Sequence, residues 1–278
     1  MEIYIVTDST CDLPQEIIHK NKISVIPLFI HMGSKDFRDG IDLTRHEFYE
    51  RIPGFKHAPT TAAPGPDVFC QVYEKLAVAG ATQILSIHIS NRLSAIVDIA
   101  RSAGKETTAA QVTVFDSRQL SLGTGFEVLT AAQAAAQGHS IDEILSILEE
   151  QIARTHVFAA LDTLEYLKRS GRMNFAMSTL GNILHIKPLL KMYDGNPTSE
   201  RVRTRKGAHK RLIELLDEYY PFEQVAVVHS HAFDRAQALL QEVRGILPSG
   251  DIWIEEINPV LGAHLGPGVL GFACISKK

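Results

Sequence analysis

Hydroxyl side chains lie where predicted strands end, and hydroxyls at such positions can bind an anion. Thr60 and Thr61 stand in "PTTAAPGP", and Ser94 closes "SNRLS". Because loops and helix N-termini meet at the carboxyl ends of parallel strands, hydroxyls and free backbone N–H groups there can form an anion pocket. Helix capping explains each hydroxyl singly, since Ser, Thr and Asp are preferred N-caps. The other polar residues at strand ends are Asp8, Ser9, Thr10, Ser90 and Ser117.

The run "NPVLGAHLGPGVLG", residues 258 to 271, holds a single ionisable side chain, His264. The apolar segment gives this imidazole few competitors for a hydrogen bond, and a core histidine with its hydrogen bonds satisfied is the alternative. Ser94 and His264 together would suit a serine-dependent acyl hydrolase, because acyl transfer needs a nucleophile and a base. No GxSxG elbow is present and no carboxylate stands out as the third member, so this reading remains an alternative.

Two further motifs suggest a dinucleotide site and a metal site, but their sequence context does not fit either. Gly266, Gly268 and Gly271 spell GxGxxG, but a dinucleotide site needs a following helix and a later acidic residue, and only seven residues remain after Gly271. His229 and His231 share one face of a predicted strand. They lack an HExxH pattern, a carboxylate cluster and a cysteine partner, so we expect no metal site.

Basic residues gather in "LKRSGRMN" and "RVRTRKGAHKR". A solvated helix start is the usual explanation for such a run. Two basic clusters in one domain could instead form a docking face for an acidic partner or for a nucleotide's phosphates.

The first half of the chain alternates strand and helix patterns, which predicts a parallel α/β sheet. Brief apolar runs predict the strands, and helical periodicity ending on glycine predicts the helices. The expected strands are 3–9, 23–30, 83–90 and 112–117, and the expected helices are 66–80, 92–104 and 125–138.

A capped amphipathic helix before a strand at 156–162 places a domain boundary near residue 153. We therefore expect a parallel α/β domain over 1–153 and a mixed-sheet α/β domain over 154–278. In the second domain the patterns predict a helix at 177–184 and a hairpin at 187–204. A helix, a strand, a helix and two terminal strands should follow.

Composition limits the classes of function. The chain has 278 residues, 45% of them hydrophobic, and a net charge of -4, which offers no global positive field for nucleic acid. Cys11, Cys70 and Cys274 show no CxxC spacing, which argues against a disulfide framework or a thiolate zinc site. The N-terminus does not resemble a signal peptide and no apolar run approaches a bilayer span, so we expect a cytoplasmic protein.

Read in order along the chain, several stretches resemble the DegV family, whose members include the fatty-acid-binding subunits of bacterial fatty acid kinase. The resemblance covers the whole chain and is strong because the stretches keep their order and spacing. They are "VTDSTCDLP", "TTAAPGPDVF", "ISNRLSAIVDIAR", "VFDSRQLSLGTG", "LDTLEYLKRSGRM", "RVRTRK" and "NPVLGAHLGPGVLG".

This resemblance implies a two-domain DegV-like α/β fold with a long-chain fatty acid in an apolar tunnel. The family's carboxylate-binding threonine, serine and histidine match Thr61, Ser94 and His264, which we expect to suffice without an arginine. We take Thr60, Asn91, Gly266 and Gly268 as supporting loop residues. The chain departs from the family pattern at Ala62, Ala63 and Ala95, next to the matched hydroxyls.

The resemblance also implies a carrier, not an enzyme, which needs no cofactor and presents its fatty acid to a separate kinase subunit that makes acyl phosphate. The chain shows no P-loop of its own. Arg172, Arg203 and Arg205 are the candidate docking residues for that fatty acid kinase catalytic subunit. We expect no nucleic acid partner and no transmembrane segment in this chain. Transient contact with a membrane surface is compatible with this expectation. Besides a hydrolase, a stand-alone sensor of another apolar acid remains an alternative.

Overall fold

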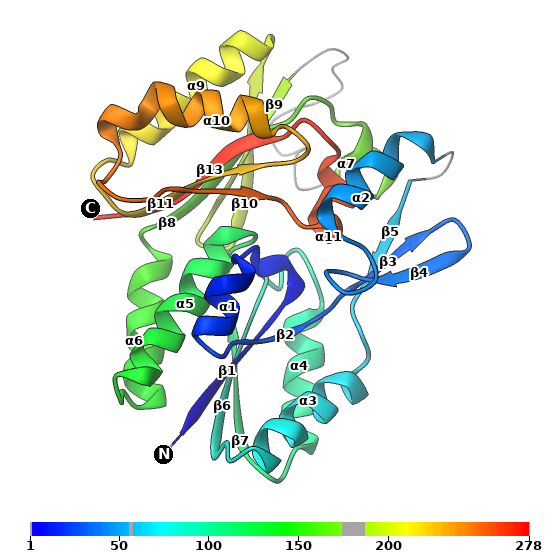
Figure 1. The fold of residues 1–278 in the computed structure, drawn as a ribbon, viewed down its shortest axis with the longest axis vertical. Coiled ribbons are helices and arrows are strands. Elements are labelled where there is room, and N and C mark those ends of the chain that lie inside the picture. Colours follow the sequence, from blue (N-terminus) through cyan, green and yellow to red (C-terminus); the bar gives the residue numbers. More distant parts are fainter. Residues whose placement is uncertain (1, 56–57, 174–186, 278) are drawn as a thin grey trace.

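A computed structural model describes residues 2–55, 58–173 and 187–277 (Figure 1). Within these residues the strands form three sheets. A four-stranded sheet has the order β2-β1-β6-β7, a six-stranded sheet has the order β10-β9-β8-β13-β11-β12, and a small sheet has the order β4-β3-β5. The α/β fold class expected from the sequence is confirmed.

The four-stranded sheet is parallel throughout. Helices α5 and α6 cover one face and α3 and α4 the other, as expected for strands joined by helical crossovers (Figure 1). Its strands are β1 (Ile3–Asp8), β2 (Ser24–Ile26), β6 (Gln83–His88) and β7 (Gln111–Asp116). The helices are α1 (Gln15–Lys20), α3 (Pro66–Val78), α4 (Ile96–Glu106), α5 (Leu122–Ala136) and α6 (Ile141–Ile152).

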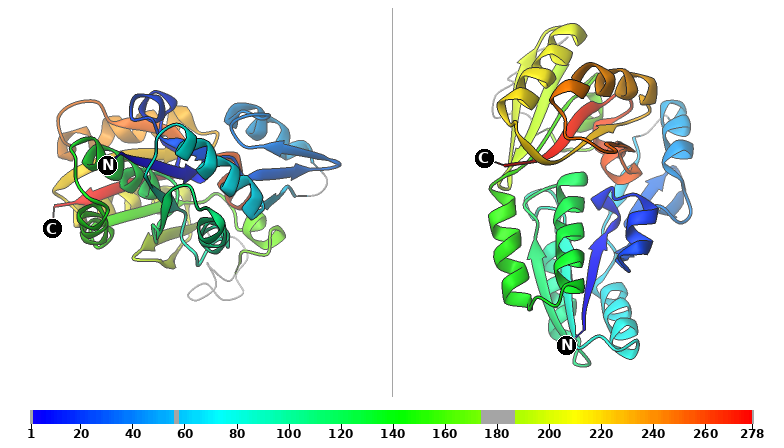
Figure 2. Two further views of the ribbon diagram at one scale, coloured as in Figure 1. Left: turned by 90° about the horizontal axis from the view of Figure 1, so that it is seen from below. Right: turned by 60° about the vertical axis from the view of Figure 1, so that its left-hand side comes forward.

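The six-stranded sheet is mixed and lies beyond the carboxyl ends of the parallel strands (Figure 2). Helices α9 (Arg205–Glu218) and α10 (Phe233–Val243) cover its outer face. Its strands are β8 (Thr155–Ala160), β9 (Lys187–Tyr193), β10 (Asn196–Val202), β11 (Phe222–His229), β12 (Trp253–Glu256) and β13 (Leu270–Ser276). The last strand of the parallel sheet, β7, ends at Asp116, α6 ends at Ile152, and the first strand of the mixed sheet, β8, begins at Thr155. The division into two domains near residue 153 stays a prediction.

The β9–β10 hairpin is confirmed, with Asp194 and Gly195 at positive φ in its turn. The helix expected at 177–184 lies outside the described residues.

The expected single strand at 23–30 is wrong. Strand β2 ends at Ile26, and after Pro27 the chain leaves the parallel sheet and forms β3 (Phe29–Met32), which pairs with β4 (Lys35–Arg38) and β5 (Thr60–Ala62). Proline interrupts the ladder because it has no N–H to donate. Thr60 and Thr61 thus lie on β5, where we expected a loop before a helix.

A helix that the sequence patterns do not predict lies between the last two strands. α11 (Pro259–Leu265) begins at Asn258, whose side chain accepts a hydrogen bond from the N–H of Leu261, and Pro259 occupies its first position. Both features are favourable at a helix start. The helix ends at Gly266, which has a φ of 76°.

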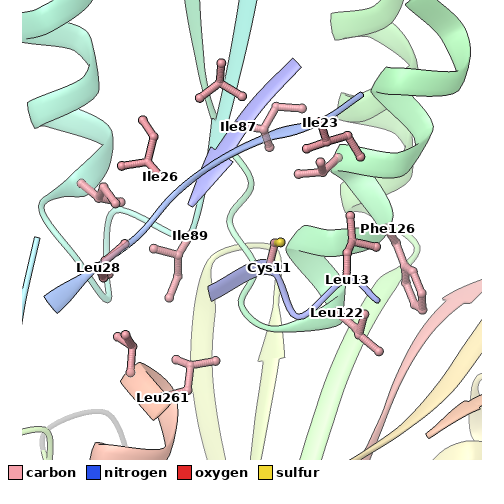
Figure 3. Close-up of a cluster of buried hydrophobic side chains, with 14 of the residues drawn as sticks. Cys11, Leu13, Ile23, Ile26, Leu28, Ile87, Ile89, Leu122, Phe126 and Leu261 are labelled. Atoms are coloured by element: carbon pink, nitrogen blue, oxygen red, sulfur yellow. The ribbon is translucent and has the colours of Figure 1, made fainter. Parts of the chain in front are cut away.

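The core is continuous between the two sheets. Figure 3 shows part of one buried cluster, in which Leu261 of α11 joins Leu28, Ile89 and other side chains of the first domain. Successive residues of β8 point to opposite faces of the sheet, so Val157 packs in this core and Phe158 packs in a second cluster with side chains of α9 and α10. Helix α11 is therefore packed into the first domain although it belongs to the second half of the chain.

Candidate ligand site

A cavity of about 310 Å³ lies between the two sheets. It is bounded by the carboxyl end of the parallel sheet, by β5, by β8 and β9, and by α11. Most of its lining is apolar, including Leu28, Ile89, Val157, Leu190 and Met192. Such a surface favours an apolar ligand, since pockets of this kind place a few polar groups in a mainly hydrophobic wall.

Thr61 and His264 meet in this cavity although they are 203 residues apart in sequence. Thr61 Oγ1 lies 3.1 Å from His264 Nε2. The small antiparallel sheet places Thr61 opposite Ile30 on β3, and α11 places His264 in its last turn. The two side chains therefore come from elements whose positions the sequence patterns do not predict.

His264 is held as a neutral imidazole. Burial, and secondly the nearby Arg172 guanidinium, lowers the pKa of His264 to about 4. Its Nδ1 atom is buried without a hydrogen-bond partner among the described residues. Because an unpaired buried N–H is rarer than an unpaired acceptor, we assign the proton to Nε2. Thr61 Oγ1 then accepts from Nε2–H, and the hydroxyl hydrogen of Thr61 is left to donate into the cavity.

Ser94 lines the same cavity from the turn before α4. Its N–H donates to the carbonyl of Ser90 at 3.1 Å, and its Oγ makes no hydrogen bond within the described ranges. The next residue, Ala95, is the N-cap of α4 and offers no side-chain acceptor to the first turn. This end of the cavity therefore combines a hydroxyl with a helix N-terminus, whose partial positive charge favours an anion.

Of the other strand-end residues, Thr10 also reaches the cavity. Its hydroxyl and N–H both donate to Asp8, which also lies 2.9 Å from His88 Nδ1. Burial opposes ionisation of Asp8, but the hydrogen bonds from His88 and Thr10 lower its pKa overall. Ser117 instead bonds to Thr124 at 2.9 Å inside the first domain. The expected convergence of hydroxyls thus involves Thr10, Thr61 and Ser94.

The four supporting loop residues do not line this cavity. Thr60 is exposed on β5, and exposed Asn91 donates its N–H to Asp116. A Cβ at Gly266 would overlap the ring of Tyr166 on α7 (Glu165–Arg169), and one at Gly268 would overlap Asp162. These glycines allow close packing around the end of α11.

The three candidate docking arginines have different surroundings. Arg172 lines the cavity, so a cation lies nearer to the ligand site than the sequence analysis expects. Arg205 pairs with Asp162 at 2.7 Å beside a neighbouring cavity of about 350 Å³. Arg203 is exposed at the end of the β9–β10 hairpin.

The three departures from the family pattern border the ligand cavity. Ala62 and Ala63 follow Thr61, and Ala95 follows Ser94. Their methyl groups add apolar surface next to the hydroxyls and no hydrogen-bonding group. The polar character of this end therefore rests on the hydroxyls, His264 and Arg172.

The geometry does not favour an acyl hydrolase. A serine nucleophile needs a hydrogen bond to its base, and the base needs a third group that orients it. Within the described residues His264 Nε2 bonds to Thr61, and no carboxylate contacts its Nδ1.

The described residues offer neither a metal site nor a membrane-spanning helix. No group of three or more His, Cys, Asp or Glu side chains there could hold a metal ion. Every helix in that part of the chain is too short or too polar to span a bilayer.

Comparison with known proteins agrees with this geometry. The family model described as "Uncharacterised protein, DegV family" matches residues 2–277. The chain belongs to the DegV family. A DegV domain-containing protein of Streptomyces coelicolor is 34% identical over 281 residues, which cover 99% of each chain.

Two solved structures of DegV proteins are similar to this one over nearly the whole chain. One, a DegV family protein from Thermus thermophilus described by its fatty acid binding, has a TM-score of 0.90 and 33% identity, covering 99% of this chain and 100% of its own. The other, DegV from Bacillus subtilis, is described as a fatty acid binding protein and has a TM-score of 0.91 and 31% identity, with the same coverage. These likenesses confirm the DegV fold expected from the sequence.

Proposed function

We propose that this DegV protein binds a long-chain fatty acid in the cavity between its two sheets. The observation that carries the proposal is one apolar cavity with Thr61, Ser94 and His264 in its lining. The fatty acid binding described for the relatives from Thermus thermophilus and Bacillus subtilis supports it.

Affinity would come mainly from the acyl tail. Each buried methylene contributes about 0.8 kcal/mol, so roughly a dozen offer on the order of 10 kcal/mol before ordering and association costs. The tail would lie along the apolar wall made by residues such as Val157, Leu190 and Met192. The carboxylate needs only enough hydrogen bonds to avoid an unpaired buried charge.

The carboxylate would accept hydrogen bonds from the Thr61 and Ser94 hydroxyls. His264 orients the Thr61 hydroxyl through its Nε2–H, and Arg172 supplies a positive charge at the same cavity. Two hydroxyl donors bind a carboxylate without the bidentate ion pair that an arginine would form with both of its oxygens. A carboxylate oxygen would thus remain available to a phosphoryl donor.

We further propose that the carrier presents this carboxylate to a separate kinase subunit, which forms the acyl phosphate. Arg203 and Arg205 are both exposed, but Arg205 is paired with Asp162, so Arg203 fits a docking role best of the three candidate arginines. Arg203→Glu should abolish kinase-dependent acyl phosphate formation and leave fatty acid affinity unchanged. Full acyl phosphate formation by this variant would remove Arg203 from the docking face.

The proposal is tested by mass spectrometry of the purified protein, first native and then after organic extraction. We expect a stoichiometric long-chain fatty acid in both spectra. An apo mass that persists after incubation with oleate and palmitate would overturn the proposal. Extraction of a different apolar acid would favour the sensor alternative, and Ser94-dependent hydrolysis of nitrophenyl esters would favour the hydrolase.

A further inference from the structure

The N-terminus of α11 is held by a carboxylate from the opposite end of the sequence. Asp12 follows β1, and its Oδ1 accepts hydrogen bonds from the backbone N–H of Asn258 at 2.9 Å and from the Asn258 side chain at 3.0 Å. Asn258 in turn accepts from the N–H of Leu261 at 2.9 Å. The cap that starts α11 is therefore itself fixed by Asp12.

Asp12 is held firmly in place. It is 1% exposed, and its Oδ2 lies 2.6 Å from Ser121 Oγ and its Oδ1 3.4 Å from Arg45 Nη2. Burial raises the pKa of Asp12, with Arg45, Ser121 and Asn258 opposing that rise. Oδ1 can accept from Asn258 in either protonation state, because a protonated carboxyl can carry its hydrogen on Oδ2, facing Ser121.

A short helix, α11, connects the Asn258 cap held by Asp12 to His264. α11 spans only Pro259–Leu265, so His264 lies less than two turns from the Asn258 cap. A shift of the cap should therefore move His264. At the far end Ser230 Oγ donates to the carbonyl of Gly266 at 2.7 Å, which ties α11 to the second domain. Asp12 ties its beginning to the first domain, which also carries Thr61.

The turn that holds Asp12 carries a second residue of the ligand site. Thr10 lies two residues earlier and lines the cavity. Asp12 has a φ of 56°, and its carboxylate accepts hydrogen bonds from Asn258, while the N–H of Thr10 donates to Asp8. One short turn therefore supports the ligand site directly through Thr10 and indirectly through α11.

We propose that Asp12 is a positioning residue for His264: by fixing the Asn258 cap it sets the position of α11 and keeps His264 Nε2 within hydrogen-bond distance of Thr61. This inference rests on the proposed function, because it gives Asp12 a role in fatty acid binding. Asp12 itself does not touch the ligand.

The test compares Asp12→Gly with Asp12→Asn. Glycine removes the carboxylate and adopts positive φ without cost, whereas asparagine keeps an acceptor for Asn258 and places a donor at Ser121. Asp12→Gly should weaken oleate binding about tenfold, the scale of a lost buried hydrogen bond to a carboxyl group. Asp12→Asn should bind within about twofold of the unchanged protein.

Titration of His264 by NMR separates positioning from general destabilisation. In Asp12→Gly the pKa of His264 should rise from about 4 toward its ordinary 6.5, because the displaced imidazole would be more exposed to water. Unchanged oleate affinity and an unchanged His264 titration in a folded Asp12→Gly variant would overturn the inference. Ser121→Ala removes the hydrogen bond to Oδ2 of Asp12 and keeps both bonds from Asn258 to Oδ1, so it should shift the titration of His264 less than Asp12→Gly does.

Two further variants complete the design. If Asp12→Gly does not fold, Asn258→Ser keeps a capping oxygen for α11 but removes the amide donor to Asp12; it should weaken oleate binding, and full affinity would count against the inference. His264→Ala tests the proposed function separately. Unchanged oleate binding by His264→Ala would refute the assigned ligand site, whereas weak binding by His264→Ala with full binding by Asp12→Gly would refute only the role of Asp12.

Discussion

Among the single residues of the proposed ligand site, Thr61 has a hydroxyl whose orientation is set by a hydrogen bond to an imidazole. His264 Nε2 lies 3.1 Å from Thr61 Oγ1, and the cavity around them is mainly apolar. In such surroundings a missing donor is costly because the ligand carboxylate has few other partners. The exposed neighbour Thr60, on the opposite face of the same strand, provides a natural comparison.

Thr61→Val should weaken oleate binding by at least about tenfold, since valine keeps the shape of threonine and removes its hydroxyl. Thr60→Val should bind oleate normally. Displacement of a fluorescent fatty acid measures both affinities. Equal affinities in the two variants would contradict the role assigned to Thr61.

The neutral state of His264 predicts a dependence of stability on pH. Its pKa is lowered from 6.5 to about 4 in the folded protein, so between these values the unfolded chain binds more protons. The free energy of unfolding should therefore fall as pH drops from 6.5 to 4, and His264 should contribute no slope above that range. Chemical denaturation of the protein and of His264→Asn at several pH values should show a smaller loss in the variant. Parallel curves would show that His264 is not buried as a neutral group.

At the scale of elements, α11 and β5 bring the polar residues together. β5 belongs to the small antiparallel sheet and α11 to the connection between β12 and β13. α11 can end where it does because Gly266 adopts a φ of 76° and lets Tyr166 approach its backbone. The packing of α7 against this glycine thus sets the end of the helix that carries His264.

Gly266→Ala should destabilise the protein by about 1–3 kcal/mol, because alanine is strained at positive φ and its Cβ would overlap Tyr166. Gly245→Ala is the matched control, since a Cβ there meets open space at an ordinary φ. Urea denaturation measures both changes. A Gly266→Ala variant as stable as Gly245→Ala would show that Tyr166 does not constrain the end of α11.

At the scale of the whole molecule, the ligand cavity lies between two sheets that belong to different halves of the chain. The buried core is continuous across this junction, so the halves are joined by packing as well as by the chain. A ligand in the cavity adds further apolar contacts to both sides. Binding should therefore stabilise the fold as a whole.

Oleate at a hundred times its Kd should raise the free energy of unfolding by about 2.7 kcal/mol. For a chain of this size that corresponds to a Tm several degrees higher. Differential scanning calorimetry with and without oleate measures the shift. Thr61→Val at the same oleate concentration, with an affinity at least about tenfold lower, should show at most about half of this stabilisation. An equal shift in both proteins would indicate binding outside the cavity.

The α/β class, most parallel strands and helices of the first half, the β9–β10 hairpin and the DegV resemblance could be predicted from the sequence, because they depend on local periodicity, turn residues and the order of motifs. The sequence also singled out Thr61, Ser94 and His264. Three features appear only in the folded chain: the separate sheet that the chain enters after Pro27, the helix α11 in a glycine-rich run, and the place of Arg172 in the cavity lining. Local patterns cannot show these features, because each depends on contacts between segments far apart in the chain: β5 needs β3 as its partner, and α11 needs the carboxylate of Asp12 to hold its cap.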